Sequence, residues 1–247
     1  MADWNDTQKE RPGFGTAPRA NSEVAGRASY DEGLRSYMLS IYNYMASGVL
    51  LTGVVAMAAA ATGLAYALAS GPLMWIVSLA PLGFILAMNF GLNRMSTGTL
   101  HILFWSFATV MGLSMSTIFL VFTGESIALT FFATAGAFAG LSLWGYTTKK
   151  DLSGFGTFLI MGVFGLIIAM ILNFFLQSGT LAFVISALGV LIFAGLTAYD
   201  TQRLKNQYAH VAGTDFMGKA VIMGATSLYL DFINMFMFLL QFLGSRD

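Results

Sequence analysis

The sequence predicts an all-α polytopic membrane protein with seven transmembrane helices behind a charged N-terminal tail. Of the 247 residues, 57% are hydrophobic and 10% are charged, and the mean hydropathy is +0.73. A soluble domain carries about 25% charged residues. The charges are also unevenly placed, because residues 1–35 hold 11 of the 24 and residues 36–199 hold only five. This division predicts a polar tail, 1–35, and a membrane domain, 36–247.

The tail is predicted to be disordered. Trp4, Phe14 and Tyr30 are its only aromatic side chains, and Pro12 and Pro18 interrupt any helix. So few apolar side chains cannot offset the entropy that is lost on ordering. We therefore expect residues 1–35 to form no fixed structure.

Seven stretches are long and apolar enough to cross a bilayer, whose core needs about 20 residues of helix. The first is longer than necessary, and Tyr37, Tyr42 and Tyr44 suit a position in the interface. Short polar links at 70–72, 123–126 and 177–180 separate later spans, and the one long link is expected at 201–219. The predicted spans are 38–68, 73–92, 100–122, 127–146, 155–176, 181–199 and 220–243.

The basic residues predict the orientation of these spans. With seven spans, the tail and the second, fourth and sixth links lie on one side and hold 11 of the 12 Lys and Arg residues. The positive-inside rule makes that side cytoplasmic. We therefore expect the N-terminus inside and the C-terminus outside. A wrong number of spans would scramble this bias, so the bias also supports seven.

The composition excludes several classes of protein. The net charge is zero, so no basic surplus exists to bind nucleic acid. Without cysteine there is no disulfide framework or thiolate metal site, and His101 and His210 are too far apart in sequence to suggest a zinc pair. We expect no cofactor.

Small residues predict where helices pack closely in the membrane. Gly136 and Gly140 form a small-xxx-small pair in the fourth predicted span. Gly162 and Gly165 lie on one face of the fifth. Such patterns predict a tight bundle and name no function.

Polar residues inside the spans are the candidate functional groups, because an ionisable side chain in a membrane is costly. Asp231 lies near the middle of the seventh span. At 100° per residue, Ser227, Asp231, Asn234 and Gln241 fall within about 80° of the helix circumference. A narrow polar face with apolar flanks should point toward other helices or a water-filled path.

The sixth span has a comparable stripe that ends in Asp200, at its predicted cytoplasmic border. Arg94, at the end of the second span, is the basic residue placed to pair with Asp200. A direct pair of Asp200 and Asp231 requires the seventh span to begin below the membrane surface, which we expect. The alternative is structural: Asp231 only bonds a neighbouring helix and Asp200 is an ordinary boundary residue.

Two carboxylates in a low-dielectric site cannot both ionise cheaply, so the pair titrates as a unit. Such a pair responds to protons: it holds its two helices together while one proton is shared, and it loosens when both groups are charged. Asp200 and Asp231 also supply the hard oxygen ligands that calcium prefers, so they are candidate transient calcium ligands.

Three motifs carry a resemblance to a known family. They are Tyr199-Asp200-Thr201-Gln202, the run SLYLDFINMF at 227–236, and TKKDLS at 148–153. Together they resemble the Bax inhibitor-1 family, most closely its bacterial YccA-like branch, over 35–244. The resemblance implies a seven-helix fold with the last helix central, in a bacterial inner (plasma) membrane.

The resemblance also implies a function. It is a pH-sensitive calcium leak governed by an aspartate dyad, here Asp200 and Asp231, with Arg94 as the arginine partner; Ser227 and Asn234 line the same polar face. Some bacterial members modulate an FtsH-type membrane protease. Members often carry an acidic residue in the second span, whereas 73–92 has none.

The sequence lacks residues that two other classes of membrane protein require. An intramembrane aspartyl protease needs Gly-x-Gly-Asp at its second aspartate, but Leu228, Tyr229 and Leu230 precede Asp231. A retinal protein needs a lysine within the last span, and Lys219 lies at its start. We therefore expect no enzyme. The alternative that stays open is a non-conducting regulator that binds an FtsH-type protease. The sequence predicts no oligomeric state.

Overall fold

The computed structural model describes residues 20–245, and this part of the chain is entirely helical apart from its links. Apolar runs with few breakers form the long helices, and each ends where a glycine, proline or polar cluster interrupts the run. The elements are α1 (Ala20–Ala61), α2 (Leu64–Ala69), α3 (Leu73–Gly91), α4 (Thr97–Met115), η1 (Ser116–Leu120), α5 (Gly124–Thr147), α6 (Ser153–Leu176), α7 (Gly179–Val211) and α8 (Met217–Leu243).

The prediction of seven spans is confirmed, since seven helices of the described chain are long and apolar enough to cross a membrane. The first predicted span, 38–68, is divided in the structure. Gly63 adopts a left-handed conformation with φ of 76°, which ends α1 and starts the short α2. The third predicted span likewise divides into α4 and η1.

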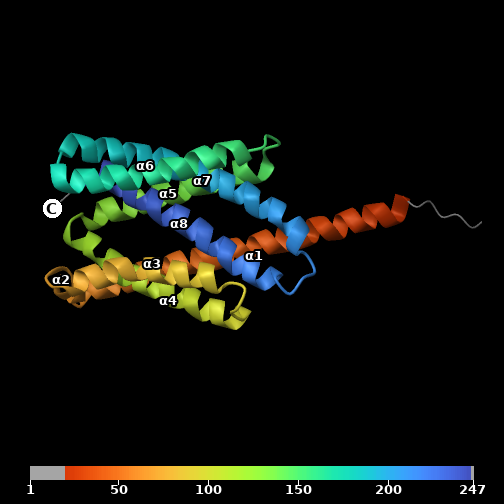
Figure 1. Ribbon diagram of the computed structural model, residues 1–247, viewed down its shortest axis with the longest axis horizontal. Coiled ribbons are helices and arrows are strands. Elements are labelled where there is room, and N and C mark those ends of the chain that lie inside the picture. Colours follow the sequence, from red (N-terminus) through yellow and green to blue (C-terminus); the bar gives the residue numbers. More distant parts are fainter. Residues whose placement is uncertain (1–19, 246–247) are drawn as a thin grey trace, which may run out of the picture.

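Helix α8 is central, as predicted. In its most apolar window 72% of the residues are buried, against 11% for α3 and for α6. Figure 1 shows α8 crossing between two groups of helices: α1, α3 and α4 on one side, and α5, α6 and α7 on the other. Two seams between these groups therefore have α8 as their floor.

The glycines that permit close packing are only partly those predicted, since a Cβ at Gly162 of α6 would meet Ile192 of α7 at 3.0 Å. A Cβ at Gly145 of α5 would overlap the backbone of Ala198 in α7, so only glycine allows this approach. By contrast, a Cβ at Gly136 or at Gly140 meets nothing within 4 Å. The predicted small-xxx-small pair therefore makes no close contact within the described chain.

The predicted disordered tail lies partly outside the described residues, which begin at residue 20. Residues 20–35 belong to α1, so they are helical where the sequence predicted disorder. Helix α1 projects beyond the rest of the bundle (Figure 1). Aromatic packing explains the order near the bundle: the ring of Tyr208 in α7 lies 5.1 Å from Tyr30 and 5.4 Å from Tyr37.

The predicted long link, 201–219, is wrong. Helix α7 continues to Val211 and α8 begins at Met217, so five residues connect them. Gly213 in this turn has φ of 72°, which allows the tight reversal. Both helices therefore extend past the ends that their hydrophobicity predicted.

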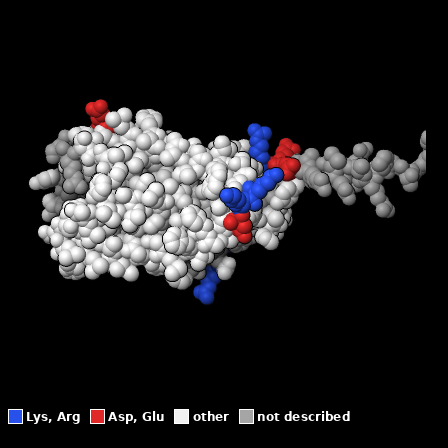
Figure 2. Space-filling model, turned by 90° about the horizontal axis from the view of Figure 1, so that it is seen from above, with Lys and Arg blue, Asp and Glu red and all other residues white. Residues whose placement is uncertain are grey.

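Charge divides the bundle into two ends. On the face shown in Figure 2, Lys and Arg gather, with acidic groups beside them, at the end from which α1 projects, and only an acidic group is seen at the other end. The links at this end, which we call the basic end, contain Arg94, Lys149 and Lys150. The C-terminus lies at the opposite end (Figure 1).

Candidate functional site

Asp200 lies inside a helix and not at its end. Because α7 runs on to Val211, eleven residues of helix follow Asp200, and its side chain sits on the buried face with Leu196, Thr197 and Leu204. The residue is only 5% exposed. The sequence placed Asp200 at the border of a span because the polar residues that follow it resemble a link.

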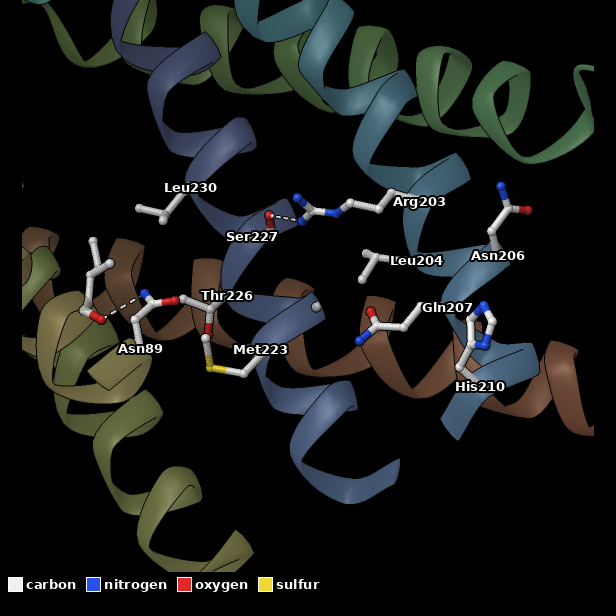
Figure 3. A pocket seen from close by; sticks show the side chains of 12 residues that line it. Asn89, Arg203, Leu204, Asn206, Gln207, His210, Met223, Thr226, Ser227 and Leu230 are labelled. Atoms are coloured by element: carbon white, nitrogen blue, oxygen red, sulfur yellow. Dashed lines mark hydrogen bonds between the residues drawn. The ribbon is translucent and has the colours of Figure 1, made fainter. Parts of the chain in front are cut away.

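A polar cavity of about 620 Å³ occupies one of the two seams, between α3 and α7 with α8 as its floor. Figure 3 shows Asn89 of α3 facing Arg203, Gln207 and His210 of α7 across Met223, Thr226 and Ser227 of α8. Asn89 lies close to the end of α3 and His210 in the last turn of α7. The cavity therefore lies toward the basic end of the bundle.

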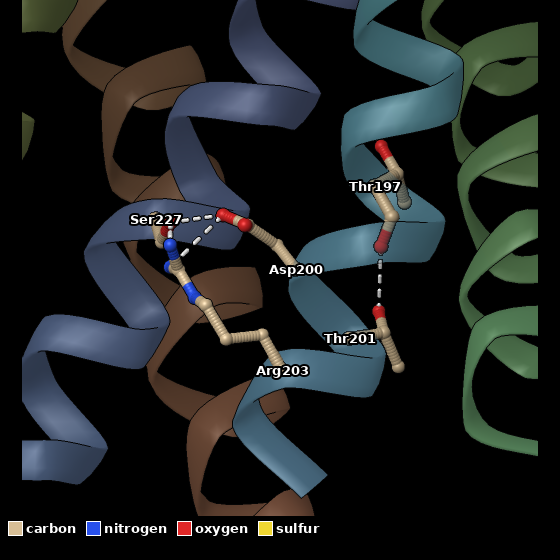
Figure 4. Close-up of polar contacts among 5 residues, drawn as sticks. All are labelled: Thr197, Asp200, Thr201, Arg203 and Ser227. Atoms are coloured by element: carbon tan, nitrogen blue, oxygen red, sulfur yellow. Dashed lines mark hydrogen bonds and ion pairs between the residues drawn. The ribbon is translucent and has the colours of Figure 1, made fainter. Parts of the chain in front are cut away.

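At the wall of this cavity, three side chains join α7 to α8 (Figure 4). The Ser227 hydroxyl donates a hydrogen bond to Asp200 Oδ2. Arg203 Nη2 lies 3.2 Å from the same oxygen and donates to Ser227 Oγ at 3.1 Å. We call these three residues the latch. Both donors act on one carboxylate oxygen, so the contact joins α7 to α8 at a single point.

Asp231 lies one helical turn beyond Ser227, deeper in the bundle. It is 5% exposed, and its Oδ2 has no hydrogen-bond partner among the described residues. Its carboxyl group is close enough to Asp200 and Arg203 for both to act on it electrostatically. A buried carboxylate oxygen without a partner is costly when it is charged, so this arrangement suits a neutral, protonated Asp231.

The structure corrects one predicted pairing. Arg203, three residues after Asp200 on the same helix, is its cationic partner, whereas Arg94 is exposed in the turn after α3. The i, i+3 spacing that joins Asp200 to Arg203 was present in the sequence. It was missed because residues after Tyr199 were assigned to a link. The Arg203 guanidinium also lies 5.8 Å from the Tyr199 ring centre.

The remaining predicted site residues divide in two. Ser227 is in the latch, as the polar stripe on α8 suggested. Asn234 is half-buried, and its amide donates to the carbonyl of Leu230 in the same helix at 2.8 Å. At the far end of the stripe, Ser186 of α7 donates to Gln241 Oε1 at 3.4 Å. The stripe therefore ties α8 to α7 at both ends.

The motif after Tyr199 also has a structural role. Gln202 Oε1 accepts the backbone N–H of Leu152 at 2.9 Å, and its Nε2 donates to the carbonyl of Lys150 at 2.8 Å. This amide therefore satisfies backbone groups in the link between α5 and α6. Two of the three motifs found in the sequence thus contact each other, and they position α7 beside that link.

The acidic pair does not form a complete metal site in this arrangement. Within the described residues, no group of three or more His, Asp or Glu side chains comes together. Calcium takes six to eight oxygen ligands. Two carboxylates and the Ser227 hydroxyl can supply only part of that number, so water or backbone oxygens must complete it.

These features define a class: a polytopic helical membrane protein with a buried carboxyl pair at the end of a polar cavity. The chain belongs to the Bax inhibitor-1 family, since residues 34–247 match the family described as "Inhibitor of apoptosis-promoting Bax1". It is 42% identical over 233 residues to the Escherichia coli inner membrane protein YbhL, and this match covers 93% of the chain and 98% of YbhL.

Two further relatives are uncharacterized. The chain is 47% identical over 220 residues to Rickettsia prowazekii protein RP147, covering 88% of this chain and 93% of the relative. It is 48% identical over 240 residues to a Caulobacter vibrioides protein, and this match covers 92% of the chain and 96% of the relative. The likeness therefore extends over nearly the whole membrane domain.

Proposed function

We propose that this protein is a pH-sensitive calcium leak channel of a bacterial inner membrane, with its basic end in the cytoplasm. The observation that carries the proposal is the buried, partnerless carboxyl oxygen of Asp231, one turn beyond a latch that closes the inner end of a polar cavity. The location rests on the seven spans and on the relative named as an inner membrane protein. The orientation rests on the positive-inside rule.

The described arrangement fits the closed state. Ser227 and Arg203 hold an ionised Asp200, and Asp231 keeps the one proton of the pair. While Asp231 is neutral, it neither repels Asp200 nor attracts a cation. Helices α7 and α8 then stay joined across the latch, and the cavity ends there.

A rise in pH opens the path. When Asp231 loses its proton, two negative charges face each other in a poorly hydrated site, where Coulomb repulsion is strong. The pair relieves that repulsion by admitting water and a divalent cation from the cavity, and Asp200 exchanges its bonds from Ser227 and Arg203 for the cation. Calcium suits this exchange because it accepts carboxylate, hydroxyl and water oxygens in flexible geometry.

The test is calcium flux into liposomes that contain the purified full-length protein, between pH 6 and 8. Flux should rise with pH in the wild type. Asp231→Asn, which mimics the protonated carboxyl, should hold flux at its low value throughout. Asp200→Asn should flatten the profile by removing the negative charge that an ionised Asp231 would face. The matched control is Glu125→Gln, at the first turn of α5. Flux no greater than in empty liposomes at every pH would exclude conduction.

The second candidate is a non-conducting regulator of an FtsH-type membrane protease. One observation favours it: α1 projects beyond the bundle at the basic end, where a partner can bind it (Figure 1). The liposome assay separates the two, because a pure regulator passes no calcium. Crosslinking from the projecting part of α1 to the protease would then support regulation, and the absence of a crosslink would contradict the proposal that this protein regulates the protease.

A further inference from the structure

The second seam of the bundle contains an apolar groove between α1 and α5, again with α8 as its floor. It consists of two connected cavities of about 940 and 320 Å³. The two share four lining residues: Val49, Leu50, Phe131 and Phe232. We call them together the lateral groove. It lies apart from the polar cavity, with which it shares no lining residue.

The lining of the lateral groove is aliphatic and aromatic along most of its length. It runs from Met38 near the basic end of α1 to Met57 and Phe119 near the opposite end. Water is poorly accommodated in an apolar space of this kind, and empty space between helices forfeits dispersion contacts. In a bilayer the available filler of matching chemistry is an acyl chain.

The mouth of the groove carries a pair of opposite charges. Asp31 and Arg35 both line it, one helical turn apart on α1, and both are exposed. Neither forms an ion pair within the part of the chain that the structure describes. A phosphate has its complement in Arg35, and a primary ammonium group has its complement in Asp31.

Hydroxyl groups lie just inside this mouth. The hydroxyls of Tyr42 and Ser142 are 2.6 Å apart, and both residues line the groove. Ser142 in turn bonds Thr201 of α7 at 2.8 Å. The Tyr42 hydroxyl therefore meets α5 across the groove, about two to three helical turns along α1 from Asp31 and Arg35. The order along the groove is thus charged pair, hydroxyls, apolar channel, which is the order of groups along a glycerophospholipid.

We infer that the lateral groove binds one molecule of phosphatidylethanolamine, with one acyl chain between α1 and α5. Its phosphate contacts Arg35, its ammonium contacts Asp31, and its ester oxygens lie near Tyr42 and Ser142. The occupant is zwitterionic because the mouth presents both signs of charge, which an anionic headgroup such as phosphatidylglycerol does not match.

The experiment is native mass spectrometry of the full-length protein in detergent with an equimolar mixture of phosphatidylethanolamine and phosphatidylglycerol. The wild type should retain one phosphatidylethanolamine in preference to phosphatidylglycerol. Arg35→Gln should lower that retention about fivefold, which corresponds to about 1 kcal/mol for a contact at an exposed site. Asp31→Lys should reverse the preference toward phosphatidylglycerol, a gain that misfolding cannot imitate.

A bulky side chain in the groove tests the acyl-chain contact separately. Ala139→Trp places an indole on the lining of the groove, whereas Ala137→Trp adds one on the same helix outside it. Only the first should lose the bound lipid. Equal retention by both variants, or an unchanged preference in Asp31→Lys, would overturn the inference. Neither result bears on calcium flux, so the proposed function is tested independently.

Discussion

Replacing Ser227 by alanine should open the proposed leak under acidic conditions, where we expect the wild type to be closed. Ser227 donates to Asp200 Oδ2 and accepts from Arg203 Nη2 at 3.1 Å, so it is the only contribution of α8 to the latch. Alanine removes the hydroxyl and leaves every charge in place. Any change in flux therefore comes from the lost tie between α7 and α8.

The size of the effect follows from that hydrogen bond. A hydrogen bond to a charged group stabilises by about 1.5–3 kcal/mol. Asp200 is buried but Ser227 is only partly so, which favours the lower end of the range. A loss of about 1.5 kcal/mol shifts the balance between closed and open states by about tenfold. Calcium flux at pH 6 should rise by that factor while flux at pH 8 changes little.

The assay is calcium flux into liposomes, with entrapped dye to show that the vesicles stay intact. Ser186→Ala is the matched control, because it removes a serine of α7 whose bond to Gln241 of α8 is long, at 3.4 Å. Arg203→Gln should also raise flux at pH 6, whereas Arg94→Gln should not. Flux in Ser227→Ala equal to that of the wild type at pH 6, or an equal effect of Arg94→Gln, would refute the latch.

Three other predictions concern packing and local structure. Gly145→Ala should lower thermal stability in detergent by about 1–3 kcal/mol, since its Cβ overlaps the α7 backbone, whereas Gly136→Ala should not. Tyr229→Phe should destabilise by about 1 kcal/mol in the same assay by removing the 2.7 Å bond to Thr52. Hydrogen bonds from Ser153 lower the pKa of Asp151 below its ordinary value of 3.8. Asp151 should therefore stabilise the start of α6 fully above pH 3.8, and this stabilisation should be lost as the pH falls through the lowered pKa of the folded protein. An NMR titration of Asp151 measures that pKa.

Much of the fold could be predicted because a bilayer imposes a simple rule on sequence. Each span needs a run of apolar residues, and breakers such as 70–72 separate the runs. Helix ends were less predictable. Residues 200–211 are polar enough to resemble a link, yet α7 continues through them, because buried residues such as Leu204 and Tyr208 pack its face against α1 and α8.

The candidate site was predictable in part. Ser227 and Asp231 share one face of an apolar helix, and helical periodicity alone reveals that. The partner of Asp200 was not predicted, because the choice between Arg94 and Arg203 depends on where α7 ends. The lateral groove was not predicted either, since its lining residues come from helices that are distant in the sequence, α1, α5 and α8 among them.

By itself, the sequence determined that this is a seven-span membrane protein with a buried carboxyl group in its last helix. Those properties follow from hydrophobicity and periodicity, which act along a single segment. Only the tertiary structure decided that Arg203 closes the latch, that Gly145 and not Gly136 permits close packing, and that one seam is polar while the other is apolar. These properties depend on which faces of separate helices meet, and packing across the bundle sets that.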